Sequence, residues 1–130
     1  MSSSSVTSSA PRRWTSISLW AVRALLALAF AAAGTAKLYG VPMLVEEFEH
    51  IGLGQWFRYL TGTLEILGAV VILVPSRAAF GALLLVCIMI GAIFTHLFVI
   101  GGSPVPALLL LVLSAIVVYA KRGQIVTRRV

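Results

Sequence analysis

Charged side chains are scarce in this sequence, and acidic ones are the scarcest. Only 11% of the 130 residues are charged, and four of them are Asp or Glu. Soluble domains carry about 25% charged residues, because a polar shell must cover the core. This chain is 60% hydrophobic and has a mean hydropathy of +1.04. An ordinary water-soluble domain is therefore excluded, and the composition predicts a chain surrounded by lipid.

Residues that build disulfide, metal and haem sites are also nearly absent. Cys87 is the single cysteine, so the sequence allows no internal disulfide. The two histidines, His50 and His96, are too few for most metal sites and do not have haem-binding spacing. Phosphate-binding glycine loops and the HExxH zinc motif are missing as well. We therefore predict no metal site, no evident cofactor motif, and an accessory subunit rather than a self-contained enzyme.

Four long apolar runs make up most of the chain. Each approaches the roughly 17–25 residues with which a helix crosses a ~30 Å hydrocarbon layer. The predicted spans lie at about 17–38, 57–74, 78–100 and 104–120. Together they form one transmembrane domain, 17–120, between a disordered Ser-rich polar tail at 1–16 and a basic tail at 121–130.

Prolines and short connections arrange these predicted helices. Pro75 closes the second run and Pro104 opens the fourth, where a missing N–H costs least. The turns after the second and third runs hold only a few residues, so consecutive helices must be antiparallel. The predicted fold class is therefore all-α, an integral membrane four-helix up-down bundle.

The long connection at 40–56 is predicted to contain a short amphipathic helix outside the membrane, at about 43–50. Pro42 suits its first turn and Gly52 suits its C-cap. Its apolar residues share one face and its glutamates lie elsewhere, so the helix should lie flat on the outer leaflet or cap the bundle. It is either an amphipathic connector or a lid over an outward-facing site.

The basic residues predict the orientation. A surplus of ten Lys and Arg over four acids suggests nucleic acid binding in a soluble protein. Here, however, most of them flank the apolar runs without interleaved aromatics: Arg12, Arg13, Arg23, Arg77, Lys121, Arg122, Arg128 and Arg129. We predict both termini on the cytoplasmic side of a bacterial inner membrane, contacts to anionic lipid heads, and no nucleic acid partner. A cleavable signal peptide is the alternative for the first helix, although Arg23 interrupts its apolar region.

Three ionisable residues within or at the ends of the spans are candidates for a site, because a charge at bilayer depth is costly. Glu65 lies roughly 12 Å inside the second span. Lys37 and His96 lie near the outer ends of the first and third spans, so antiparallel packing places all three at similar depth. They form either a ligand-binding or proton-relay pocket, or an ion pair or hydrogen bond that only joins helices. The small residues expected at helix contacts are Gly34, Gly62, Gly68 and Ala92.

His96 is expected to face the bundle interior. Its helix face carries small or apolar residues such as Ala82 and Ala92. The opposite face, which includes Cys87 and Phe94, is expected to face lipid.

Short motifs in a fixed order resemble one protein family. The motifs are Gly34-Thr35-Ala36-Lys37-Leu38, Ile51-Gly52-Leu53, Tyr59-x-x-Gly62-x-x-Glu65-x-x-Gly68, and Gly91-Ala92 with His96. Over about residues 20–120 the pattern resembles the DoxX and DoxX-like family of small four-helix bacterial membrane proteins. The resemblance implies a link to membrane redox chemistry, since some relatives are described as subunits of a thiosulfate:quinone oxidoreductase and others as partners of secreted oxidative-stress enzymes. Lys37, Gly62 and Glu65 match the motif, and His96 is compatible with it.

Three classes of function remain open. The first is an accessory subunit of a membrane redox complex, in which Lys37 and His96 donate hydrogen bonds to the carbonyl oxygens of a quinone. The second is a structural or assembly scaffold without redox chemistry, and the third is a small transporter or cargo receptor. Besides the lipid bilayer, we expect a protein partner or a second copy of the chain.

Overall fold

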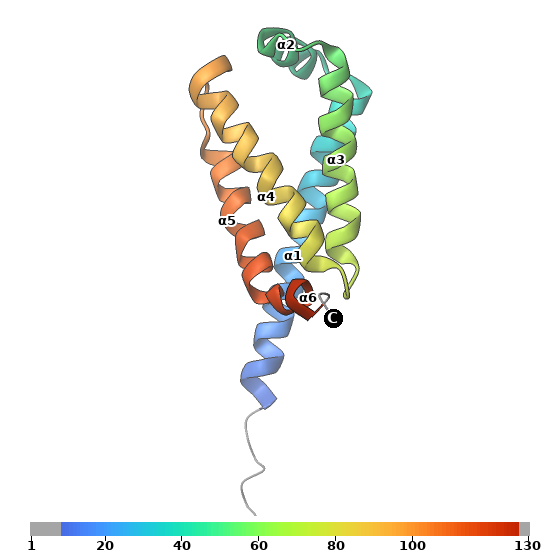
Figure 1. Ribbon diagram of the computed structural model, residues 1–130, viewed down its shortest axis with the longest axis vertical. Coiled ribbons are helices and arrows are strands. Elements are labelled where there is room, and N and C mark those ends of the chain that lie inside the picture. The colour runs from blue at the N-terminus through green and yellow to red at the C-terminus, as the bar shows by residue number, and fades with distance from the viewer. Residues whose placement is uncertain (1–8, 128–130) are drawn as a thin grey trace, which may run out of the picture.

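The computed structural model describes residues 9–127, and they are almost entirely helical (Figure 1). The helices are α1 (Ser9–Tyr39), α2 (Pro42–Ile51), α3 (Gln55–Leu73), α4 (Ala78–Thr95), the π-helix η2 (His96–Ile100), α5 (Val105–Ala120) and α6 (Arg122–Thr127). Residues 9–127 contain no strand. The all-α prediction is therefore confirmed.

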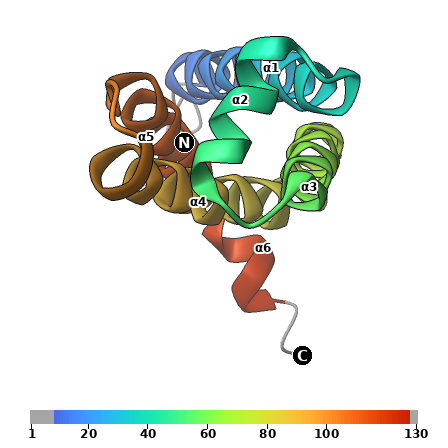
Figure 2. The ribbon, with the colours of Figure 1, turned by 90° about the horizontal axis from the view of Figure 1, so that it is seen from above.

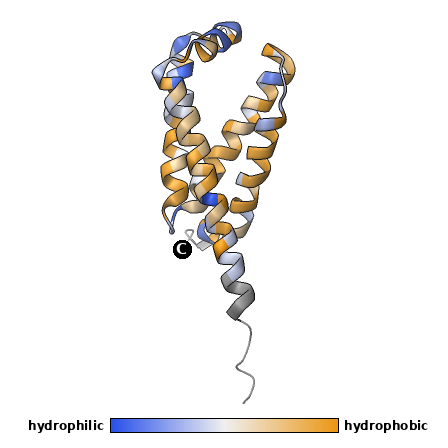
Figure 3. Cartoon of the chain, turned by 180° about the vertical axis from the view of Figure 1, so that it is seen from behind, coloured by the Kyte–Doolittle hydropathy of each residue, from blue (hydrophilic) through white to orange (hydrophobic). Residues whose placement is uncertain are grey.

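Three helical segments are long and apolar enough to cross a membrane. They are Trp14–Tyr39, Gln55–Leu73 and Ala78–Ile100. α5 is apolar too, but with 16 residues it is shorter than a usual span. In Figure 3 the middle parts of the long helices are mostly hydrophobic, whereas polar residues gather around α2. Such an exposed apolar surface is consistent with a membrane protein.

The long helices pack side by side around a common core. α1 packs on α3, α3 on α4, α4 on α5, and α5 on α1. The chain direction alternates from each long helix to the next (Figure 1). α2 contacts α1, α3 and η2 and crosses one end of the space between the long helices (Figure 2). Fully buried apolar side chains from all four long helices form the core, among them Leu26, Phe30, Ile72, Leu85 and Val117.

Glycines allow two pairs of helices to approach closely. A Cβ added to Gly34 of α1 would lie 2.6 Å from the carbonyl oxygen of Gly62 in α3. A Cβ added to Gly81 of α4 would lie 2.5 Å from the backbone nitrogen of Ile72 in α3. Gly68 in the same way leaves room for the side chain of Leu85. Small residues are thus required where α3 crosses α1 and α4. Ala92, the fourth small residue expected at a helix contact, packs at the edge of the core.

The chain is helical beyond both ends of the predicted transmembrane domain. α1 begins at Ser9, so residues 9–16 are helical and do not belong to a disordered tail, while residues 1–8 lie outside the described part. Pro11 is tolerated there, because the first four N–H groups of a helix have no intrahelical acceptor. Residues 9–16 extend a helix that the apolar span has already nucleated, so the costly first turn does not have to form separately.

The predicted basic tail is also helical over α6. The side chain of Gln124 accepts a hydrogen bond from the backbone N–H of Ala79 at 3.0 Å. The same side chain donates to the carbonyl of Pro75. Gln124 therefore satisfies groups at the turn between α3 and α4 and holds α6 against the start of α4.

Candidate functional site

A cavity of about 480 Å³ lies near the end of the molecule that α2 covers. Most of its lining is apolar and comes from every long helix and from α2, including Phe30, Phe48, Ile51, Phe57, Leu60, Leu64, Ile88, Met89, Ile100 and Leu110. The ionisable lining residues, apart from Cys87, are Lys37, Glu47, Glu65 and His96. An apolar pocket of this volume with a few polar groups is typical of a small-molecule site.

The cavity is open because α4 and α5 diverge from α1 and α3 toward the α2 end (Figure 1). At the other end, the contact of Gly81 with Ile72 holds α3 and α4 together. Leu60 of α3 and Cys87 and Gly91 of α4 line the cavity and are also exposed on the surface. The cavity therefore opens sideways, between α3 and α4. Cys87, which was expected to face lipid, is exposed and lies at this opening.

Lys37 and Glu65 form an ion pair in the cavity wall. Lys37 Nζ lies 2.9 Å from Glu65 Oε1, and Glu65 is 2% exposed. The two residues each follow a glycine of the α1–α3 contact by three positions, Gly34 and Gly62. Because helical side chains lean toward the N-terminus of their own helix, the two side chains meet beside this contact. The predicted burial of Glu65 and its pairing with Lys37 are confirmed.

His96 lines the same cavity but does not bond to Glu65. Its Nδ1 lies 2.9 Å from the carbonyl oxygen of Gly101, at the end of η2. A carbonyl can only accept, so Nδ1 must carry the proton. In the neutral ring Nε2 is then a hydrogen-bond acceptor. In this arrangement the single N–H of the neutral ring is used by the helix end, so donation from His96 to a ligand, which stays a prediction, would need the doubly protonated ring.

Arg58 of α3, which was not predicted to be a site residue, stabilises the end of the cavity that α2 covers. It is 5% exposed and donates from Nη1 to the carbonyl of Lys37 and from Nε to Gln55 Oε1 at 2.7 Å. Gln55 in turn donates to the carbonyl of Val45 in α2 at 3.1 Å. The last carbonyls of α1 lack intrahelical partners and form the negative end of the helix dipole, so Arg58 caps α1. An arginine in the first turn of an apolar helix is the signal that points to this role.

At the opposite end of the molecule, Arg23 caps α3 in the same way. It was predicted to be a charge that flanks a membrane span, and the structure corrects this prediction. It is 1% exposed, and its Nε donates to the carbonyl of Ile72 at 2.8 Å, in the last turn of α3. The ring of Trp20 lies against its guanidinium, 3.9 Å from Cζ to the ring centroid. α1 and α3 thus cap each other reciprocally, each with a buried arginine. Burial is favoured because α3 ends just before Pro75, and Arg23 supplies a donor to the carbonyl of Ile72 in its last turn.

α2 forms one wall of the cavity and is slightly longer than the predicted 43–50. Phe48 is its buried residue and packs on Phe57 of α3, with ring centroids 5.9 Å apart. Glu47 was expected to point away from the apolar face, but it is half-buried and lines the cavity. Its carboxylate, together with the Lys37–Glu65 pair, makes the cavity unfavourable for an anionic ligand.

A metal ion has no evident ligand set in this cavity. Within residues 9–127, no three His, Cys, Asp or Glu side chains come together as a metal site requires. Besides the hydroxyls of Thr61 and Thr95 and the Cys87 thiol, the cavity offers an ammonium, two carboxylates and one imidazole.

Sequence comparison relates the chain to known proteins. Residues 21–120 match the DoxX-like family. The uncharacterized protein YdgD of Bacillus subtilis (strain 168) is 40% identical over 77 residues, which cover 56% of this chain and 68% of that protein. No solved structure matches the chain significantly. The family match extends over all the long helices and includes Lys37, Glu65 and His96, and the chain therefore belongs to the DoxX-like family.

Proposed function

We propose that this DoxX-like protein is a membrane-embedded accessory subunit that binds the ring of a quinone in its cavity, on behalf of a redox partner. The cavity carries this proposal, because it combines a volume of about 480 Å³, an apolar lining and the Lys37–Glu65 pair. A neutral ring suits it better than a charged substrate, since Lys37 is already paired. The opening between α3 and α4 suits a ligand that arrives from the bilayer.

In this proposal α1, α3, α5 and the continuous α4 and η2 all cross the inner membrane as an up-down bundle. Both termini are cytoplasmic and α2 lies outside. The alternating helix directions and the exposed apolar residues along all four helices support this arrangement (Figures 1 and 3). α5 rises about 24 Å over its length, somewhat less than a typical hydrocarbon layer. The four acids of the sequence lie between Glu46 and Glu65, so the end with α6 is the basic end, as the positive-inside rule requires.

The polar groups of the cavity fit the two oxygens of such a ring. The Lys37 ammonium has three N–H donors, of which one faces Glu65 and two remain for a ligand carbonyl. The neutral His96 ring offers Nε2 as an acceptor, which suits a hydroxyl. When bound, a quinone would accept and release electrons together with protons. Glu65 holds the ammonium in place, and His96 takes or returns a proton at Nε2.

The native Cys87 provides a direct test, because it lies at the opening and is the single cysteine of the sequence. The purified protein in nanodiscs is labelled with a maleimide, with or without a fully substituted benzoquinone that bears a decyl tail. We expect the quinone to slow labelling, and decanol at the same concentration to leave the rate unchanged. Mass spectrometry of gently purified protein should also detect bound quinone.

Variants separate binding from packing. Lys37→Met/Glu65→Leu keeps the volume but removes the polar pair, so protection of Cys87 should be lost. Thr63→Val is the control, since Thr63 is exposed on α3 and bonds only to the carbonyl of Tyr59. If quinone neither copurifies nor protects Cys87, the proposal is wrong. A stoichiometric protein partner would then indicate a scaffold, and Glu65-dependent flux in liposomes a transporter.

A further inference from the structure

We propose that the end of the protein opposite α2 binds the phosphate of an anionic phospholipid, between Arg23, Arg77 and Lys121. This inference rests on the membrane arrangement proposed above. It concerns the other end of the molecule, and it does not depend on a ligand in the cavity.

A buried cation with a free donor is the first observation. Arg23 is 1% exposed, and its Nε is used by the carbonyl of Ile72. Its Nη2 is buried as well and donates to no acceptor among the described residues. A buried guanidinium N–H without an acceptor is costly, and an incoming oxygen anion would satisfy it. Arginine also matches the geometry of phosphate oxygens better than any other side chain.

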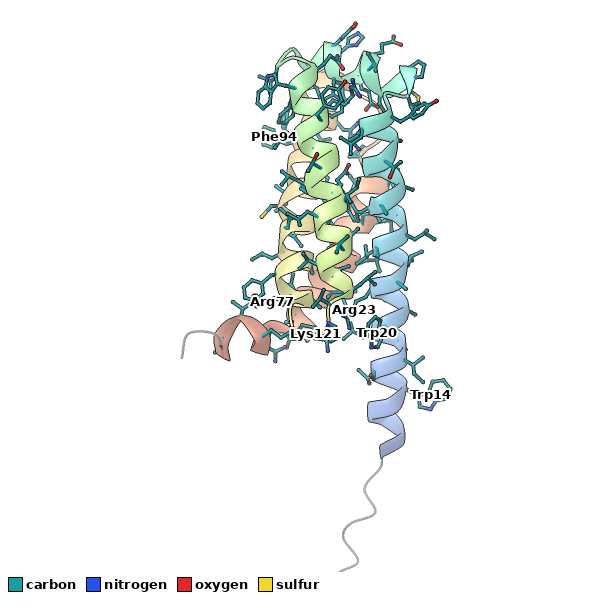
Figure 4. All side chains as sticks on the ribbon, turned by 90° about the vertical axis from the view of Figure 1, so that its right-hand side faces the viewer. Trp14, Trp20, Arg23, Arg77, Phe94 and Lys121 are labelled. Atoms are coloured by element: carbon teal, nitrogen blue, oxygen red, sulfur yellow. The ribbon has the colours of Figure 1, made fainter. Side chains whose placement is uncertain are left out.

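Two further cations surround the same turn. Ile72, the acceptor of Arg23, directly precedes the turn between α3 and α4, and Arg77 lies in that turn. Lys121 lies between α5 and α6, and Gln124 holds α6 against this turn through Pro75 and Ala79. Figure 4 shows Arg23, Arg77 and Lys121 at the same level of the molecule, with Phe94 near the opposite end. Neither Arg77 nor Lys121 makes a side-chain hydrogen bond or ion pair within residues 9–127.

No acidic side chain within residues 9–127 is placed to neutralise these cations. The four acidic residues of the sequence are Glu46, Glu47, Glu49 and Glu65. The first three belong to α2, and Glu65 is paired with Lys37 in the cavity wall. The described residues therefore supply no counter-charge at this end, and an external anion can do so. Because three cations lie at this level of the molecule, a headgroup with a net negative charge suits the site better than a zwitterionic one.

The surrounding aromatic residues place this site at the surface of the bilayer. Trp20 stacks on Arg23 and is 43% exposed, and Trp14 lies nearby on α1 (Figure 4). Tyr119 is exposed near the end of α5. Tryptophan and tyrosine gather at the level of lipid headgroups, which is where the phosphate lies. Trp20 can therefore cover the phosphate site and report on the lipid that occupies it.

The experiment measures which lipid lies beside Trp20. In a Trp14→Phe/Trp56→Phe background, Trp20 is the single tryptophan. The protein is reconstituted into mixtures in which either phosphatidylglycerol or phosphatidylcholine carries brominated chains that quench tryptophan fluorescence. We expect a preference for phosphatidylglycerol of about fivefold or more, since each basic residue near the surface contributes about that factor.

Two variants with the same chemical change distinguish a site from diffuse charge. Arg77→Gln should reduce the preference about fivefold. Arg122→Gln should change it less than about twofold, because Arg122 already donates to the carbonyl of Tyr119 and stacks on its ring. Arg23→Gln should also abolish the preference; if it does not fold, the comparison of Arg77 with Arg122 decides. Inorganic phosphate at constant ionic strength should not compete.

Equal quenching by the two brominated lipids would overturn the proposal, and so would equal effects of Arg77→Gln and Arg122→Gln. Full competition by inorganic phosphate would indicate a soluble anion site instead of a lipid site. If brominated phosphatidylcholine fails to quench Trp20 at all, the membrane arrangement itself is wrong. Failure of quinone to protect Cys87 would leave this result unaffected.

Discussion

The contact between Gly34 and Gly62 predicts a large difference between two alanine substitutions. In Gly34→Ala, the new Cβ would lie 2.6 Å from the carbonyl oxygen of Gly62 and 2.7 Å from Ile66 Cγ1. Because the oxygen belongs to the backbone, no rotamer change relieves the contact, and α1 must move away from α3. In Gly91→Ala, by contrast, nothing lies within 4 Å of the new Cβ. The two variants therefore differ in packing alone.

The expected difference in unfolding temperature follows from the cost of the new contact in Gly34→Ala. Overpacking costs about 1–3 kcal/mol. Replacement of a helical glycine by alanine gains up to about 1 kcal/mol, but this gain is common to both variants and cancels. We expect Gly34→Ala to unfold about 4–12 °C below Gly91→Ala, at roughly 4 °C per kcal/mol for a chain of this size. Thermal unfolding in a mild detergent measures the difference, and equal midpoints would refute a close helix contact at Gly34.

Three further predictions concern the ion pair and the topology. Glu65→Leu should be more stable than Glu65→Ala in the same thermal assay, because both leave Lys37 unpaired but only Ala also leaves a void; equal midpoints or the reverse order would mean that filling this volume does not stabilise the protein. Lys37→Met alone should cost about 3 kcal/mol, since it leaves the buried Glu65 unpaired, and Lys37→Met/Glu65→Leu should recover most of that loss. Strict additivity of the two single changes would argue against coupling. Reporters that are active only in the cytoplasm should give signal at both termini, whereas loss of either signal would indicate a cleaved first helix or an odd number of spans.

The Lys37–Glu65 pair could be predicted from the sequence, because helical period and antiparallel packing fix the depth and face of each residue. The roles of the two buried arginines could not. An arginine near the end of an apolar helix is equally suited to reaching the headgroups, and only the position of the neighbouring helix end shows that Arg58 and Arg23 act as caps. His96 was placed near the cavity correctly. Its bonding was missed, because a π-helix and the carbonyl of Gly101 leave no trace in apolar periodicity.

The reciprocal arginine caps also fix a length. Along α1, Arg23 and Lys37 are fourteen residues apart, as are Arg58 and Ile72 along α3, and fourteen residues of α-helix rise about 21 Å. This distance is shorter than a typical hydrocarbon layer of about 30 Å, and the short α5 agrees with it. In the proposed membrane arrangement, a thick bilayer would therefore have to thin around the protein, at a cost of fractions of a kcal/mol per Å. The distance between the two caps thus favours a bilayer of matching thickness, and the protein should be most stable in lipids with short or unsaturated chains.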